Sequence, residues 1–89
     1  MSENIDYTNL FETILKLKTV KDCELFFNDL CTYKELDSMA QRLDAAKLLM
    51  DKKGNYTYEK IIEKTGISSA TLSRVSRCVK KGEGYKKFA

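Results

Sequence analysis

The chain has 89 residues, of which 33% are charged, and its 16 Lys and Arg exceed its 13 Asp and Glu by a net +3. A chain of this length forms one small domain that buries only about 60–65% of its unfolded surface, so a partner would add needed stability. It has no histidine and its three cysteines form no CxxC pair, which argues against a metal centre and a disulfide framework. No apolar run could span a membrane, which argues against a membrane protein. We therefore expect a cytoplasmic protein without a metal or an obligatory cofactor.

The basic character belongs to the second half of the chain. Residues 1–45 have a net charge of −4, whereas residues 46–89 have a net charge of +7. Such asymmetry suggests a portion that faces a polyanion, joined to a portion with another role.

Helix-forming residues dominate, and apolar residues recur at three- and four-residue spacing, which predicts an all-α fold of about five to six helices. A first helix should begin with Thr8 or Asn9 as its cap and continue to about Thr19, where a second helix begins. On that second helix Phe26 and Phe27 point in different directions, because neighbouring residues are about 100° apart. A monomer this small would struggle to cover both rings, so we predict a homodimer.

The third predicted helix is the long central one. Thr32 and Glu35 have the spacing of a capping box, which places the start of this helix. Its apolar repeat continues to Met50, and we expect the helix to end within residues 52–55, where Gly54 stops it.

A helix-turn-helix pattern follows. Thr57 should cap a short helix over residues 58–64, and Gly66 supplies the turn before a second helix over residues 69–81. We expect one domain over residues 1–89, in which dimerisation helices and the central helix occupy 8–53, the helix-turn-helix 57–81 and a tail 82–89. Four apolar residues should lock the helix crossing. They are Ile61, Ile67, Leu72 and Val75.

The outward face of the second helix of this pair has short residues first and long basic residues later. This gradient suits a helix that enters the major groove by its N-terminal end. Short side chains there can approach the edges of the nucleobases, while the long Arg and Lys side chains further along reach phosphates. An ordinary helical hairpin with a polar outer face is the competing interpretation. The predicted DNA-binding residues are Thr57, Ser68, Ser69, Ala70, Thr71, Ser73, Arg74, Arg77 and Lys80.

Two segments resemble a known family. The segments CTYKELDSMAQRLDAAKLL and YTYEKIIEKTGISSATLSRVSRCVKK are similar to the Trp repressor superfamily, and the likeness is strongest to its group labelled YerC/YecD. The resemblance extends from Thr32 to about Lys81. It implies an intertwined all-helical homodimer of Trp-repressor type, whose two reading helices lie about 34 Å apart on DNA.

The resemblance also implies a small-molecule co-repressor. Trp repressor binds tryptophan between two arginines, which Arg42 and Arg74 match. Val75 replaces a glycine that lines the indole pocket and would fill space that the indole needs, so tryptophan is disfavoured and another anionic effector is the alternative. The two arginines could instead make a phosphate contact and an intersubunit ion pair. The residues matched to the effector pocket are Thr32, Arg42, Thr71, Arg74, Val75 and Cys78.

These features predict a sequence-specific transcriptional regulator, a repressor, that binds double-stranded DNA as a homodimer. The alternative function is a helical protein–protein interaction module that retains a helix-turn-helix shape. We do not expect an enzyme, because the chain has neither a histidine nor a glycine-rich phosphate loop, and its acids suit helix caps and solvated faces.

Overall fold

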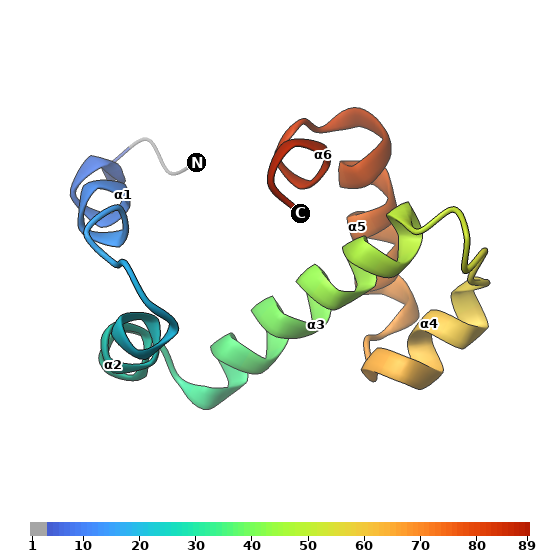
Figure 1. Cartoon of the computed structure of the whole chain (residues 1–89), viewed down its shortest axis with the longest axis horizontal. Coiled ribbons are helices and arrows are strands. Elements are labelled where there is room, and N and C mark those ends of the chain that lie inside the picture. The colour runs from blue at the N-terminus through green and yellow to red at the C-terminus, as the bar shows by residue number, and fades with distance from the viewer. Residues whose placement is uncertain (1–3) are drawn as a thin grey trace. The chain divides into compact units, whose positions relative to one another are not determined.

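The computed structural model describes residues 4–89, and this part of the chain contains six helices and no strand (Figure 1). The helices belong to two compact units, the first ending at Thr32 and the second comprising Tyr33–Ala89. None of the described helices is both long enough and apolar enough to cross a membrane. The predicted all-α class is confirmed.

The first helix, α1, comprises Thr8–Ile14 and is shorter than predicted. After it, the amide of Leu17 donates to the carbonyl of Ile14 over 3.0 Å, a three-residue spacing that tightens the chain. Thr19 is then extended, with φ −133° and ψ 163°, because it caps the next helix. A helix cannot continue through a residue in that conformation, so the predicted extension of α1 to about Thr19 is wrong.

The start of α1 also differs from the prediction, since neither Thr8 nor Asn9 caps it. The Asp6 carboxylate accepts hydrogen bonds from the Thr8 amide at 2.9 Å and the Thr8 hydroxyl at 2.6 Å. Both hydrogen bonds lower the pKa of this exposed carboxyl, and the bond from the Thr8 hydroxyl has the larger effect. Asp6 therefore supplies the acceptor that was expected of Thr8 or Asn9.

The second helix, α2, comprises Val20–Leu30 and begins where predicted. The Thr19 hydroxyl accepts the Asp22 amide at 3.0 Å, and the Asp22 carboxylate accepts the Lys18 amide at 3.0 Å. This reciprocal pair satisfies two backbone donors at the helix start.

The long helix α3 comprises Tyr33–Met50 and begins immediately after Thr32, as predicted. Its end differs, because one oxygen of the Asp51 carboxylate accepts the amides of Lys53 and Gly54, both at 3.1 Å. Asn55 then takes a left-handed conformation with φ 47°. Asp51 rather than Gly54 ends the helix. Its carboxylate accepts the two amides that would otherwise donate to carbonyls of a continuing helix.

Three helices complete the second unit: α4 over Tyr58–Thr65, α5 over Ser69–Lys81 and α6 over Gly84–Phe88. The first two match the predicted helix-turn-helix. The segment expected to be a tail instead forms α6, which packs on α3 and α5. Half-buried Tyr85 contributes to that packing.

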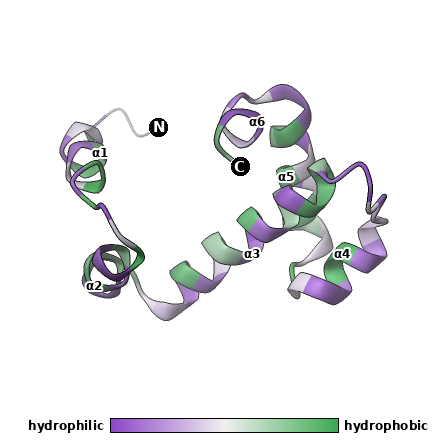
Figure 2. Cartoon of the chain, in the orientation of Figure 1, coloured by the Kyte–Doolittle hydropathy of each residue, from purple (hydrophilic) through white to green (hydrophobic). Residues whose placement is uncertain are grey.

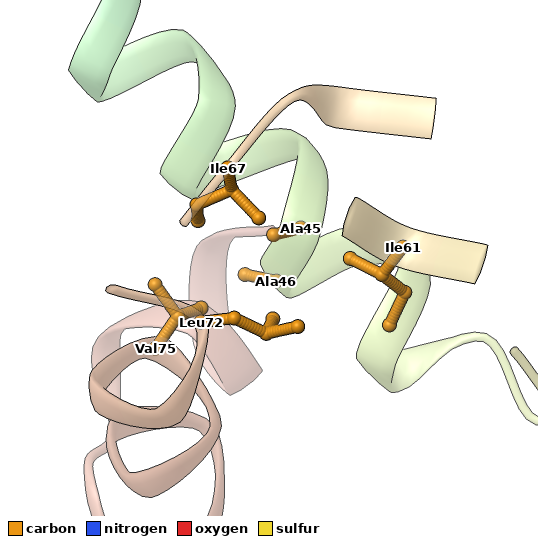
Figure 3. Close-up of a cluster of buried hydrophobic side chains, with 6 residues drawn as sticks. All are labelled: Ala45, Ala46, Ile61, Ile67, Leu72 and Val75. Carbon is orange, nitrogen blue, oxygen red and sulfur yellow. The ribbon is translucent and has the colours of Figure 1, made fainter. Parts of the chain in front are cut away.

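The core lies where α3, α4 and α5 meet. Ala45 and Ala46 of α3 are fully buried, and their small side chains allow the other helices to approach closely (Figure 3). The four residues predicted to lock the helix crossing are all buried, with at most 2% of their surface exposed. The packing of the helix-turn-helix was therefore predicted correctly. The buried cluster comprises Ala45, Ala46, Ile61, Ile67, Leu72 and Val75.

Hydrophobic and hydrophilic residues alternate around the helices (Figure 2). Several large apolar side chains of α1, α2 and their flanks remain exposed: Leu15 by 82%, Val20 by 77% and Leu25 by 62%. Phe26 and Phe27 are half-buried and contact one another edge to face, with ring centroids 5.5 Å apart. The first unit thus does not cover all of its own apolar surface.

Candidate nucleic-acid interface

The turn between α4 and α5 is fixed by backbone geometry and by one hydroxyl. Gly66 adopts the left-handed conformation, with φ 75° and ψ 7°, and its amide donates to the Ile62 carbonyl over 2.8 Å. The Thr65 hydroxyl donates to the Ile61 carbonyl at 2.8 Å and accepts the Ile67 amide at 3.2 Å. Thr65 stands where an apolar residue is usual in this motif, and these two bonds give it a structural role there.

Ser68 begins the second helix of the pair. It is extended, with φ −73° and ψ 154°, and its side chain accepts the Thr71 amide at 3.2 Å. The same hydroxyl donates to the Thr71 hydroxyl oxygen at 2.9 Å. The start of α5 is therefore held by a side-chain cap, which fixes the direction of its first turn.

The two faces of α5 differ sharply in burial. Leu72, Val75 and Ser76 are buried against the rest of the second unit. The other face is open. Of the nine predicted DNA-binding residues, which include Thr57 at the start of α4, only Thr71 is half-buried, and the other eight are exposed. The exposed residues are Thr57, Ser68, Ser69, Ala70, Ser73, Arg74, Arg77 and Lys80.

The positive charge of α5 is not neutralised within the described residues. The helix contains no acid, and neither of the two ion pairs in that part of the chain involves it. Arg74, Arg77 and Lys81 line a shallow hollow of about 290 Å³ together with Cys78 and Gly82. This concentration of unpaired cations can attract an anion.

The structure brings together only part of the predicted effector pocket. Arg74 and Cys78 line the same hollow. Val75 is 1% exposed and belongs to the core, whereas half-buried Arg42 donates from Nε to the Ser38 carbonyl at 3.3 Å.

Neither of the two threonines of the predicted pocket is among the residues that line this hollow. Thr71 lies in the first turn of α5, bonded to Ser68, and Thr32 belongs to the first unit. Lys81 and Gly82 line the hollow but were not predicted. The helical spacing of Lys81, seven residues after Arg74, is the signal that could have found it.

No group of three His, Cys, Asp or Glu residues in the described part of the chain could hold a metal ion.

Residues 6–89 of the chain match the model of the Trp repressor protein family. The chain belongs to the Trp repressor family. The uncharacterized protein YerC of Bacillus subtilis strain 168 is 52% identical over 73 residues, which cover 82% of this chain and 67% of YerC. The crystal structure of a candidate Trp repressor from Staphylococcus aureus matches with a TM-score of 0.81 at 42% identity, over 89% of this chain and 77% of that one.

These relatives confirm the resemblance and the Trp-repressor-type fold that the sequence predicted. The Trp repressor family comprises regulatory DNA-binding proteins rather than enzymes. Within that frame the open, cationic face of α5 is the candidate nucleic-acid interface.

Proposed function

We propose that this chain is a sequence-specific transcriptional repressor that binds double-stranded DNA as a homodimer in the cytoplasm. The observation that carries the proposal is the character of α5. Its buried face packs on α3 and α4. Its exposed face has small residues at the capped N-terminal end, followed by Arg and Lys side chains without ion-pair partners in the described residues. A helix held in this way can enter the major groove by its first turns.

The side chains divide into two roles in this proposal. Ser69, Ala70 and Ser73 approach base edges, because they are exposed and short. Such residues give few bidentate contacts, so bridging waters and DNA shape supply much of the specificity. The phosphate contacts come from Thr57, Thr71, Arg74, Arg77 and Lys80.

The exposed apolar surface of the first unit supports the homodimer. Leu15, Val20 and Leu25 are all largely exposed, and a monomer rarely leaves a large apolar surface open to water. In the homodimer that we propose, the two α5 helices meet one DNA duplex about 34 Å apart. Operator sites should then be palindromic.

We further propose that repression responds to an anionic small molecule other than tryptophan. The cationic hollow at Arg74 and Cys78 supports the anionic character of such an effector. The burial of Val75 argues against an indole beside that residue.

The test begins with selection of bound sequences from a random DNA pool by the purified protein. Binding to the best sequence is then measured across salt concentrations for the wild type, Arg77→Ala and, as a control, Lys18→Ala in the first unit. We expect Arg77→Ala to weaken binding to all sequences and to reduce the salt slope by about 0.9 per lost phosphate contact.

The outcomes separate the hypotheses. An unchanged salt slope for Arg77→Ala would contradict the phosphate role of that residue. Failure to enrich any DNA sequence would contradict the whole proposal and favour an interaction module, whose affinity for a protein would depend on residues such as Leu25 and not on the basic face.

A further inference from the structure

The loop between α3 and α4 holds two lysines in an ordered turn. The Asp51 carboxylate accepts the amides of Lys53 and Gly54 at 3.1 Å, and the Asn55 amide donates to the Asp51 carbonyl at 3.3 Å. Lys52 and Lys53, hereafter the loop lysines, are both exposed. The loop, which joins α3 to α4 in Figure 1, therefore presents two adjacent positive charges from a backbone that these hydrogen bonds hold.

The other lysines near α4 already have partners. Lys60 pairs with Glu63 at 3.8 Å, and the Lys64 ammonium lies 5.7 Å from the centre of the Tyr56 ring. The loop lysines take part in no ion pair or ring contact within the described residues. The Asp51 carboxylate, the acid closest to them in sequence, is instead turned to the backbone amides of the loop.

We propose that the loop lysines bind DNA phosphates beside the groove that α5 enters. The inference rests on the proposed function and extends its contact surface to a segment outside the helix-turn-helix. In a helix-turn-helix the first helix crosses the DNA backbone, and we therefore expect the loop that leads directly into α4 to lie near that strand. Unpaired lysines on such a loop exchange condensed counterions for phosphate contacts.

The loop lysines lie within reach of the same strand as Thr57. Lys53 precedes Thr57 by four residues, which span at most about 14 Å even when fully extended. Phosphates recur every 3.4 Å or so along the helix axis of one strand, so several lie within that distance. The loop contacts are therefore backbone contacts that add affinity without adding sequence preference.

The first experiment removes the two charges. The double variant K52Q/K53Q is compared with K16Q/K18Q, which removes the same charge from exposed positions in the first unit, by salt titration on the selected DNA. For two lost contacts we expect the salt slope to fall by about 1.8 and affinity at 0.1 M salt to fall roughly 60-fold, equally on specific and random DNA. The control should keep the wild-type slope.

The second experiment tests whether the loop must be ordered. Asp51→Asn and Asp51→Ala both remove one negative charge, but only the asparagine retains an acceptor for the two loop amides. We expect Asp51→Ala to bind DNA more weakly than Asp51→Asn, with equal helix content by circular dichroism. Equal binding by the two variants would show that the turn does not position the lysines.

The result that overturns the inference is distinct from failure of the proposed function. If the wild-type protein selects DNA but K52Q/K53Q keeps the wild-type salt slope and affinity, the loop makes no phosphate contact. The proposed DNA-binding role of α5 then remains supported. If the double variant and the K16Q/K18Q control lose affinity alike, the effect reflects net charge alone, and the loop contact is again rejected. If the wild-type protein selects no DNA, the proposed function and the loop contact both fail.

Discussion

Replacing Gly66 by alanine tests the physical account of the helix-turn-helix most directly. Gly66 has φ 75°, a region in which a side chain with a Cβ is strained by roughly 1–2 kcal/mol. The added Cβ would lie 3.3 Å from the Gln41 Nε2 atom, at the mobile end of a side chain that can move aside. The cost therefore comes from the backbone, and we expect Gly66→Ala to lower the free energy of unfolding by about 1–2 kcal/mol.

Two further variants separate backbone strain from other effects of the substitution. Gly84→Ala introduces the same methyl at the first residue of α6, where the new Cβ would meet no atom within 4 Å apart from its own chain neighbours and helix backbone. Alanine there should leave stability unchanged or raise it by up to about 1 kcal/mol. Gly66→Asn places at the turn a residue that tolerates the left-handed conformation, and it should recover part of the loss.

The assay is urea unfolding followed by far-ultraviolet circular dichroism, at one fixed protein concentration because a dimer is stabilised by mass action. In a thermal scan the loss at Gly66 corresponds to a fall in Tm of about 4–8 °C per kcal/mol. If Gly66→Ala and Gly84→Ala prove equally stable, or if asparagine at Gly66 is no better than alanine, the left-handed turn is not what favours glycine at this position.

Two other predictions concern packing. Leu72 is fully buried, so Leu72→Ala should cost about 2–5 kcal/mol in urea unfolding, and a cost below about 1 kcal/mol would contradict its place in the core. Leu25 is 62% exposed, so Leu25→Glu should leave the helices intact but weaken self-association in sedimentation equilibrium. Asn28→Glu adds the same charge at an exposed polar position of α2, and dissociation equal to that of Leu25→Glu would contradict a specific apolar interface.

The helix-turn-helix could be predicted because its signals are local. Thr57 and Ser68 each accept an amide three residues later, and Gly66 alone provides the left-handed residue between the helices. The backbone groups at each helix end are thus satisfied by a residue at a fixed spacing. A motif of a few consecutive residues is therefore enough to predict each helix end. Thr65 was the exception, because its hydroxyl bonds within the turn could not be read from its residue type.

Helix ends that depend on competing acceptors were predicted less well. The sequence around Gly54 favours a glycine stop, yet Asp51 ends α3 earlier by binding two loop amides. The helix α6 begins at the second of two glycines, Gly82 and Gly84, and these glycines suggested a tail. It forms because Tyr85 packs on the core and because the Lys86 ammonium donates to the Lys80 carbonyl at 2.9 Å, contacts that depend on the folded arrangement of α5 and α6.

The candidate site follows the same division. The exposed face of α5 could be predicted from its 3.6-residue period, because the buried residues Leu72 and Val75 fix which face points outward. Lys81 lies on α5 seven residues after Arg74 and could have been found from that spacing, whereas Gly82, which follows the end of α5, has no such signal. Contact of these residues with DNA or with an effector stays a prediction.

Val75 connects the packing of the reading helix to the choice of effector. The resemblance to Trp repressor aligns this valine with a glycine that lines the indole pocket, but here the side chain is 1% exposed and forms part of the core. Replacing it by glycine would forfeit about 1.5–3 kcal/mol of apolar burial and add about 0.5–1 kcal/mol for glycine inside a helix. Because the chain uses this volume for stability, we infer that any effector binds through its charge at the Arg74 hollow and not through an aromatic ring inserted beside residue 75.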